Sequence, residues 1–308
     1  MKKLTKERIV YLNGEMVPES EAKVSIHDRG FKLGDAVFDN TRTFNGEVFK
    51  VREHLDRLYR SCKYLRLDPG MSKDRMAELT HQVVDANLPL LEEGGDYWVI
   101  QRVTRGVDPP SHNAADATGC TVIIQCDPIP FTQRATLYRD GIRVITPSIR
   151  RTPPSSLSPR AKTHNYVNMV LADLEVRAQD PDAWAVLLDT NGNLAEGTGS
   201  NIFLVKDGAI YTPQDRYTLE GISRQTVLDL AHEIGIETVE GDIDLFDAYN
   251  ADEIFITSTS LCICPVSKIN GAPIADGNIP GPVTARLERA YSGFVGVDIF
   301  QQYLSRLP

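Results

Sequence analysis

Hydrophobic and polar positions in the first third of the chain alternate in ways that predict hairpins and two helices. Val10–Leu12 and Glu15–Val17 flank Asn13-Gly14, a pair that tolerates the positive φ angles of a tight turn. From Arg52 to Leu65, apolar residues recur every three or four positions, which predicts an amphipathic helix. A second helix is expected over 73–87, with Ser72 as its cap. Further strands are expected at 97–104 and 121–126, and strands at 37–44 and 48–51 flank Asn45-Gly46 in a second hairpin. This third is therefore predicted to be a compact α+β unit.

The second half alternates strands and helices. The pattern predicts strands at 143–146, 184–188, 200–205, 209–212 and 253–257, and helices at 164–178, 223–234 and 281–292. Two prolines, Pro128 and Pro130, interrupt the sheet pattern between the halves. We therefore expect a small N-terminal domain over 1–127, an interdomain linker over 128–136 and a large C-terminal domain over 137–308.

Composition narrows the function to small-molecule chemistry. The chain has 308 residues, of which 42% are apolar, and a net charge of −9. An acidic protein is poorly suited to nucleic acid or to an anionic membrane, since both favour a basic face. The first residues lack the apolar core of a signal peptide, and no run approaches the roughly 18 apolar residues of a membrane helix. We expect a cytoplasmic protein. The five scattered cysteines predict neither disulfides nor a metal site.

Two charged residues mark candidate chemistry. Lys162 stands just before an apolar run, and Glu196 stands between a turn and a strand. A lysine beside apolar residues can be desolvated, which favours the neutral amine that attacks carbonyls. The carboxylate could stabilise a cation held between the two.

Two further segments could hold an anion. Gly221 precedes the helix that starts at Ser223, and a helix N-terminus offers free backbone N–H groups to a phosphate. Thr257–Ser260 is a run of small hydroxyl residues after a strand. Taken alone, the first is more often an ordinary cap and the second an ordinary turn.

Several motifs together resemble the class IV, or fold-type IV, pyridoxal-phosphate enzymes. The motifs are E-H-L-D-R-L at 53–58, K-T-H-N-Y at 162–166, L-A-E-G-T-G-S-N-I-F at 194–203, L-E-G-I-S-R at 219–224 and T-S-T-S at 257–260. The resemblance covers nearly the whole chain. It implies an α/β (α+β) fold of two domains, with pyridoxal 5'-phosphate between a small N-terminal and a larger C-terminal domain. It also implies amino transfer from a small-molecule donor to a 2-keto acid acceptor.

The same resemblance implies roles for individual residues. Lys162 matches the lysine that forms a Schiff base with the cofactor, and Glu196 matches the carboxylate at the pyridine nitrogen. Phosphate binding is implied for Arg57, Ile222, Ser223 and Thr259, with Ser258, Ser260 and Tyr166 as further cofactor-binding candidates. The loop around Phe31 matches one that reaches the neighbouring site, so a homodimer is implied.

The substrate remains open between subfamilies. V-F-D-N-T-R-T-F at 37–44 is similar to the branched-chain aminotransferase pattern and places Arg42 on its substrate arginine. The short Lys162-Thr-His-Asn-Tyr spacing is more similar to D-amino-acid aminotransferases, yet their R-x-H carboxylate trap is incomplete, because Pro110 replaces its arginine and only His112 is left. Segment 148–159 is similar to (R)-amine transaminases. Arg102 and Arg105 are possible helpers.

Two functions other than amino transfer are compatible with the same scaffold. One is an aminodeoxychorismate lyase, although the threonine that such a lyase uses as a proton donor aligns with Asn40. The other is a protein that binds the cofactor without turnover. Neither would consume a keto acid.

Overall fold

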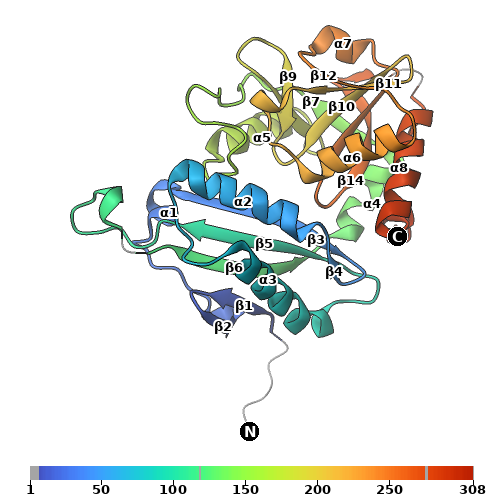
Figure 1. The fold of residues 1–308 in the computed structure, drawn as a ribbon. Helices are drawn as coiled ribbons and strands as arrows, with labels where there is room; N and C mark the ends of the chain where they lie inside the picture. Colours follow the sequence, from blue (N-terminus) through green and yellow to red (C-terminus); the bar gives the residue numbers. More distant parts are fainter. Residues whose placement is uncertain (1–6, 118, 275–276, 308) are drawn as a thin grey trace. The chain divides into compact units, whose positions relative to one another are not determined.

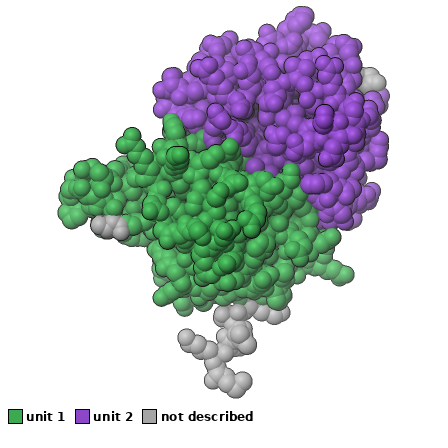
Figure 2. Space-filling view, viewed as in Figure 1, with its two compact units in different colours: residues 1–129, 161–165 green, residues 130–160, 166–308 purple. Residues whose placement is uncertain are grey.

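The computed structural model describes residues 7–117, 119–274 and 277–307. Its contacts divide the chain into two compact units, which Figure 2 colours separately. Unit 1 comprises the described residues up to Ile129 together with Ala161–Asn165. Unit 2 comprises Pro130–Arg160 and the described residues from Tyr166 onward. Five residues around Lys162 therefore belong to unit 1, although the chain on both sides of them belongs to unit 2.

Unit 1 is built on a six-stranded antiparallel sheet with the order β2-β1-β6-β5-β3-β4 (Figure 1). Asn13 and Asn45 take positive φ angles, each with a glycine after it, at the two hairpin turns that the sequence predicts. The strands are β1 (Ile9–Leu12), β2 (Glu15–Pro18), β3 (Ala36–Phe44), β4 (Glu47–Val48), β5 (Tyr97–Thr104) and β6 (Thr121–Pro128).

Two helices cover one face of this sheet. They are α2 (Val51–Leu65) and α3 (Lys73–Asn87), and they pack against each other. Ser72 caps α3 by accepting a hydrogen bond from Arg75 N at 3.2 Å, as its sequence predicts. The core beneath them includes Val37, Leu55, Leu58, Met76, Val83, Val99 and Val103. Because side chains alternate along a strand, Phe38, Asn40 and Arg102 lie on the opposite face. A short helix, α1 (Arg29–Leu33), precedes β3.

Unit 2 contains a nine-stranded mixed sheet that closes on itself. Its order is β12-β11-β10-β13-β14-β7-β8-β9, with β15 paired to β14 beside this path, and β9 pairs again with β10 through Glu196 and Asn201. The ring therefore runs from β10 through β13, β14, β7 and β8 to β9. The strands are β7 (Ile142–Ile145), β8 (Trp184–Leu188), β9 (Leu194–Gly197), β10 (Asn201–Lys206), β11 (Ala209–Pro213), β12 (Thr238–Gly241), β13 (Glu253–Ser258), β14 (Cys262–Ile269) and β15 (Ala272–Pro273).

The helices of unit 2 pack around this sheet (Figure 1). They are α4 (Phe131–Asp140), α5 (Val167–Gln179), α6 (Ile222–Glu233), α7 (Leu245–Tyr249), α8 (Pro282–Val295) and α9 (Ile299–Leu304). Short 3-10 helices occur in unit 1 at Glu19–Glu21, Leu88–Leu90 and Ala114–Asp116, and in unit 2 at Asp215–Tyr217. Within the described ranges, no helix has the length and apolar character that crossing a membrane requires.

Three predicted elements differ from the structure. Segment 128–136, the expected linker, contains the last residue of β6, Pro128, and the first residues of α4, for which Pro130 is the N-cap. The expected strand 48–51 is cut short at Val48, and α2 begins at Val51. The helix expected from residue 164 begins only at Val167, because 162–164 pair with a strand instead.

Candidate active site

Backbone hydrogen bonds fix the segment around Lys162 to strand β3 of unit 1. Phe38 N donates to Lys162 O at 3.0 Å, and His164 N donates to Ala36 O at 3.0 Å, so the segment adds a short antiparallel edge to β3. Lys162 N donates to Ser61 Oγ of α2 at 3.0 Å. The Lys162 amine lies 4.5 Å from the centroid of the Phe38 ring. Strand pairing, rather than a helix, therefore fixes this lysine.

His164 contacts the Phe38 ring, and Arg102 lies opposite Phe38 on the neighbouring strand. His164 meets Phe38 edge to face, with 5.2 Å between ring centroids, and Arg102 is the cross-strand partner of Phe38. Burial first, and the charge of Arg102 second, lower the pKa of His164 to about 4, so this imidazole is neutral at pH 7. This part of unit 1 therefore places an amine and a neutral imidazole against one aromatic ring, with Arg102 opposite that residue on the neighbouring strand.

Arg102 has an unusual environment for a partly buried arginine. Burial lowers its pKa, and its Nη1 donates to the neutral amide of Gln125 at 2.5 Å. Among the described residues, no carboxylate oxygen lies within 4.0 Å of its guanidinium nitrogens, whereas Arg42 and Arg57 each have one. Buried charges are normally paired, so Arg102 is suited to receive an anion.

Arg57 is part of a buried ion-pair network with Asp39. Its Nε and Nη2 donate to the two carboxylate oxygens of Asp39 at 2.8 and 2.7 Å. His54 Nδ1 lies 2.7 Å from Asp39 Oδ1 and must carry the proton, since a carboxylate only accepts. Burial opposes ionisation of Asp39, but Arg57 and His54 outweigh it and hold its pKa below the ordinary value. The pair fixes the Arg57 guanidinium in one orientation.

Arg42, the predicted substrate arginine, forms a buried ion pair with Asp96. Its side chain is 1% exposed, its Nη2 donates to Asp96 at 3.1 Å, and its guanidinium stacks 4.0 Å from the Phe44 ring centroid. A substrate carboxylate would have to displace Asp96 from a fully buried ion pair.

Glu196 lies on β9 with both carboxylate oxygens hydrogen-bonded. Arg151 Nε donates to Oε1 at 2.7 Å, and Leu219 N donates to Oε2 at 2.9 Å. The residue is 4% exposed. An ionised carboxylate offers about four lone-pair positions, so two remain for a further donor.

The start of α6 offers backbone donors to an anion. Gly221 is the N-cap of α6 and has no side chain that could accept a hydrogen bond. The first backbone N–H groups of the helix, those of Ile222 and Ser223, therefore receive no cap from Gly221. A side chain at Gly221 would collide with Asn201 Oδ1. The glycine therefore lets the backbone pass closely beneath Asn201.

The hydroxyl run at the end of β13 is partly used inside unit 2. Leu261 N donates to Ser258 Oγ at 3.1 Å, and Arg134 hydrogen-bonds Ser260 Oγ. Thr257 Oγ1 is buried and has no hydrogen-bond partner among the described residues. Thr259, by contrast, follows the end of the strand and is partly buried.

The two remaining predicted residues lie on different elements. Tyr166 is the N-cap of α5 and packs against the core cluster beneath that helix. Phe31 lies on α1 and is 75% exposed. His112 is exposed and pairs with Asp108 at 2.9 Å.

Comparison with known proteins identifies the family. The model of the family described as "Amino-transferase class IV" matches residues 36–269. The chain belongs to the class IV aminotransferases. It is 40% identical over 283 residues to a protein of Methanocaldococcus jannaschii named "Putative branched-chain-amino-acid aminotransferase", a match covering 92% of this chain and 94% of the relative. It is 33% identical to a D-alanine aminotransferase of Bacillus licheniformis, covering 91% and 95%.

Solved class IV aminotransferase structures share the fold. The branched-chain amino acid aminotransferase of Escherichia coli superposes with a TM-score of 0.85 at 29% identity, covering 98% of this chain and 96% of that one. The T.th. branched-chain enzyme complexed with N-(5'-phosphopyridoxyl)-L-glutamate has a TM-score of 0.85 at 32% identity, covering 97% and 98%. These matches confirm the family and the mixed α/β fold that the sequence motifs predicted.

The structure also shows residues of this aminotransferase that sequence reasoning missed. Asp39 and Arg151 were not predicted, although each contacts a predicted site residue. Asp39 had a signal: it alternates with core residues along β3, opposite a helix face that carries His54 and Arg57 three positions apart. Arg151 had none, because its partner Glu196 is 45 positions away in the sequence.

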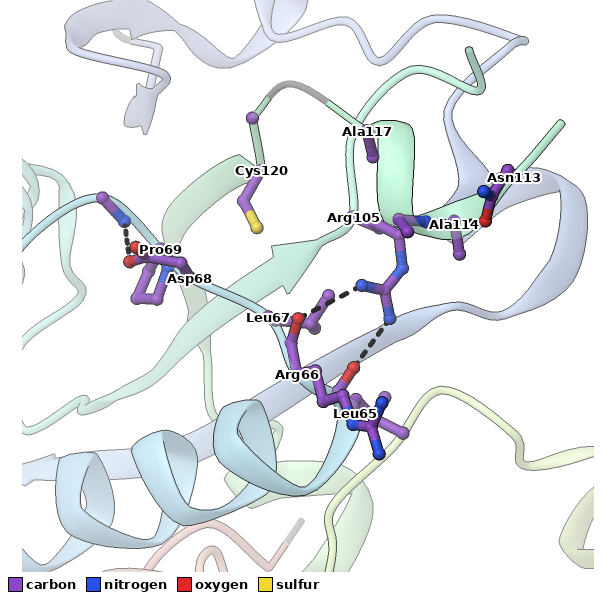
Figure 3. Close-up of a pocket in the computed structure, with 13 residues that line it drawn as sticks. Leu65, Arg66, Leu67, Asp68, Pro69, Arg105, Asn113, Ala114, Ala117 and Cys120 are labelled. Atoms are coloured by element: carbon purple, nitrogen blue, oxygen red, sulfur yellow. Dashed lines mark hydrogen bonds between the residues drawn. The ribbon is translucent and has the colours of Figure 1, made fainter. Parts of the chain in front are cut away.

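One cavity of unit 1 is lined by Arg105, a possible substrate helper, but not by Lys162, Arg57 or Arg42 (Figure 3). It has a volume of about 920 Å³ and lies between the C-terminal end of α2 and the loop that leads to Cys120. Arg105 crosses its wall and donates to Leu65 O and Arg66 O at 2.7 and 3.2 Å, and it also pairs with Asp35. The Arg105 side chain thus links the end of α2 to Asp35. Across the residues that are described, no cluster of His, Cys, Asp and Glu is suited to a metal.

Proposed function

We propose that this aminotransferase uses pyridoxal 5'-phosphate to move the amino group of an α-amino acid to a 2-keto acid, with Lys162 as the covalent attachment point. The observation that carries the proposal is the position of Lys162. Backbone pairing with β3 holds its amine beside the Phe38 ring. Arg102, which has no carboxylate partner among the described residues, lies opposite Phe38 on the neighbouring strand. Bound pyridoxal phosphate supplies an aldehyde that accepts the amino group and a ring that accepts electrons.

The residues present fit such a cofactor. Lys162 provides the amine and, once released, a base for the proton on the substrate Cα. The uncapped start of α6, with Ile222 and Ser223, suits a phosphate, and the oriented guanidinium of Arg57 suits it as well. Thr257 Oγ1 has an unused hydrogen-bonding capacity within the described residues. Glu196 keeps lone pairs for the ring nitrogen. Thr259 is a further phosphate candidate, whereas Ser258 and Ser260 already serve internal hydrogen bonds.

Substrate recognition is assigned to Arg102 rather than to Arg42. A carboxylate can approach Arg102 without displacing an acidic residue among those described, whereas Arg42 would have to release Asp96. The relatives compared above are named as aminotransferases of branched-chain amino acids or of D-alanine. These names favour amino transfer from a carboxylate-bearing donor over the lyase, the non-catalytic protein and the (R)-amine donor.

The test is the visible spectrum of the purified protein with single donors and no acceptor. L-leucine, D-alanine and (R)-1-phenylethylamine are added separately, and the donor that bleaches the band of the bound cofactor identifies the substrate class. We expect an amino acid to do so. A band that only the amine bleaches would reject the assignment to α-amino acids, and a band that no donor bleaches would reject amino transfer.

The role of Arg102 has its own test. Arg102→Met should raise the KM for the amino-acid donor by about tenfold or more, because a charge-assisted hydrogen bond is worth roughly 1.5–3 kcal/mol. The same variant should bind pyridoxal phosphate with the wild-type affinity, because the cofactor is assigned to residues other than Arg102. A matching loss of cofactor affinity would show that Arg102 supports the fold instead.

A cytoplasmic homodimer is also proposed. Its support is the family resemblance together with apolar side chains exposed on α1 and α5. Phe31 on α1 is 75% exposed, and Val167, Val170, Leu171 and Leu174 form one exposed face of α5. Light scattering should give a mass near twice the chain mass of 34.2 kDa. A particle of one chain mass would contradict the homodimer without affecting the assignment of Lys162.

A further inference from the structure

Arg151 is fixed beside the carboxylate that is assigned to the ring nitrogen. Its Nε lies 2.7 Å from Glu196 Oε1, and the two side chains are 13% and 5% exposed. The Arg151 backbone N donates to Leu188 O at 2.9 Å. Main-chain and side-chain bonds thus both hold Arg151 in unit 2.

The second oxygen of Glu196 is held as well. Leu219 N donates to Oε2 at 2.9 Å, so the carboxylate is bonded at both ends and cannot turn freely. Any further hydrogen-bond donor to Glu196 therefore binds a carboxylate that is already paired with the Arg151 guanidinium. The Arg151 charge is permanent, because arginine does not lose its proton in proteins.

We propose that Arg151 acts through Glu196 as a positioning residue that limits how strongly the pyridine nitrogen of bound pyridoxal phosphate holds its proton. This inference rests on the proposed role of Glu196. An anionic Glu196 favours the protonated ring, and the neighbouring cation opposes it, since a like charge within about 4–6 Å disfavours a second positive charge. A ring that keeps its proton less firmly accepts electrons less readily, so Arg151 tunes the electron demand on the substrate Cα–H bond.

The experiment follows the ring nitrogen directly. Holoprotein is prepared with pyridoxal phosphate labelled with 15N in the ring, and the 15N chemical shift is recorded against pH for the wild type and for Arg151→Gln. We expect Arg151→Gln to retain the ring proton to a pH higher by about 1 unit or more. Arg151→Lys keeps the charge but loses the Nε contact, so its titration should lie between the two.

The matched control is Arg150→Gln. Arg150 is the adjacent arginine and is exposed, and its described hydrogen bond, from Asn168 Nδ2 at 3.2 Å, uses the backbone O that the substitution retains. This variant should titrate like the wild type.

Three results overturn the inference. An Arg151→Gln titration that coincides with the wild type would show that the ion pair only supports the fold. If Arg151→Gln does not fold, Arg151→Met removes the same charge, and an unshifted Arg151→Met titration leads to the same conclusion. An Arg150→Gln shift equal to that of Arg151→Gln would show an unspecific charge effect.

Glu196→Gln separates this inference from the proposed function. If the 15N titration of Glu196→Gln coincides with that of the wild type, Glu196 is not the partner of the ring nitrogen, and the proposed role of Arg151 is rejected as well. A shifted Glu196→Gln titration beside an unshifted Arg151→Gln titration would reject the Arg151 inference alone.

Discussion

Replacing Asp39 by Asn should separate the two roles of the buried ion pair in unit 1. Asp39 is fully buried and receives two hydrogen bonds from Arg57 and one from His54, at 2.7 to 2.8 Å. Asparagine keeps the volume but removes the charge, and its amide group would face the Arg57 donors with donors of its own. Removing one partner of a buried pair costs about 3–5 kcal/mol, so unit 1 should lose that much unfolding free energy at pH 7.

The pH dependence of this loss follows from the pKa of Asp39. The folded-state pKa lies below the ordinary value, so the stabilisation is present above the unfolded pKa of about 3.9 and is lost as the pH falls. The difference between the wild type and Asp39→Asn should therefore be constant from pH 6 to 8 and should shrink below about pH 4.

The chain offers a separate optical probe for each unit. It has two tryptophans, Trp98 on β5 in unit 1 and Trp184 on β8 in unit 2. In a Trp184→Phe background, urea unfolding followed by fluorescence reports on Trp98 alone, which avoids treating two units as one transition. A loss below about 1 kcal/mol for Asp39→Asn would refute the reasoning on this pair.

A second variant isolates the effect on the cofactor. Asp96→Asn breaks another buried pair of unit 1, that with Arg42, and should cost a similar amount of stability. Only Asp39→Asn should release the orientation of Arg57 and so reduce the preference of the apoprotein for pyridoxal phosphate over pyridoxal, which lacks the phosphate. An equal reduction in both variants would reject the role of Asp39 in orienting Arg57.

Three further outcomes are expected. Lys162→Ala should lose amino transfer and the mass increase that borohydride reduction gives the wild-type holoprotein; retention of either would end its assignment. Gly221→Ala should weaken pyridoxal phosphate binding to the apoprotein by about tenfold, because the new methyl group meets Asn201; unchanged affinity in a fluorescence titration would contradict this. Burial first, and the charge of Glu253 second, raise the pKa of Glu288 to about 9. The folded state then keeps a proton that the unfolded chain releases near pH 4.3, so stability falls as the pH rises toward 9. Glu288→Gln should remove this slope and be at least about 1 kcal/mol more stable at pH 8, and a flat wild-type urea-unfolding profile over that range would contradict it.

The sequence by itself determined the local elements and the family. Hairpins at Asn13-Gly14 and Asn45-Gly46, the amphipathic helix α2 and the Ser72 cap depend on neighbouring residues, so periodicity and turn chemistry predict them. Short motifs around Lys162 and Glu196 identified the class IV aminotransferases, because they bring chemically specific residues together within a few positions.

Only the tertiary structure decided how the charged residues are paired. The sequence favoured Arg42 as the substrate arginine, with Arg102 and Arg105 as possible helpers. In the structure, Asp96 pairs with Arg42 and Asp35 pairs with Arg105, and Arg102 has no carboxylate partner among the described residues. The pairing of the Lys162 segment with β3 joins residues more than a hundred positions apart. Such contacts depend on how distant strands come into register, and local propensity carries no information about them.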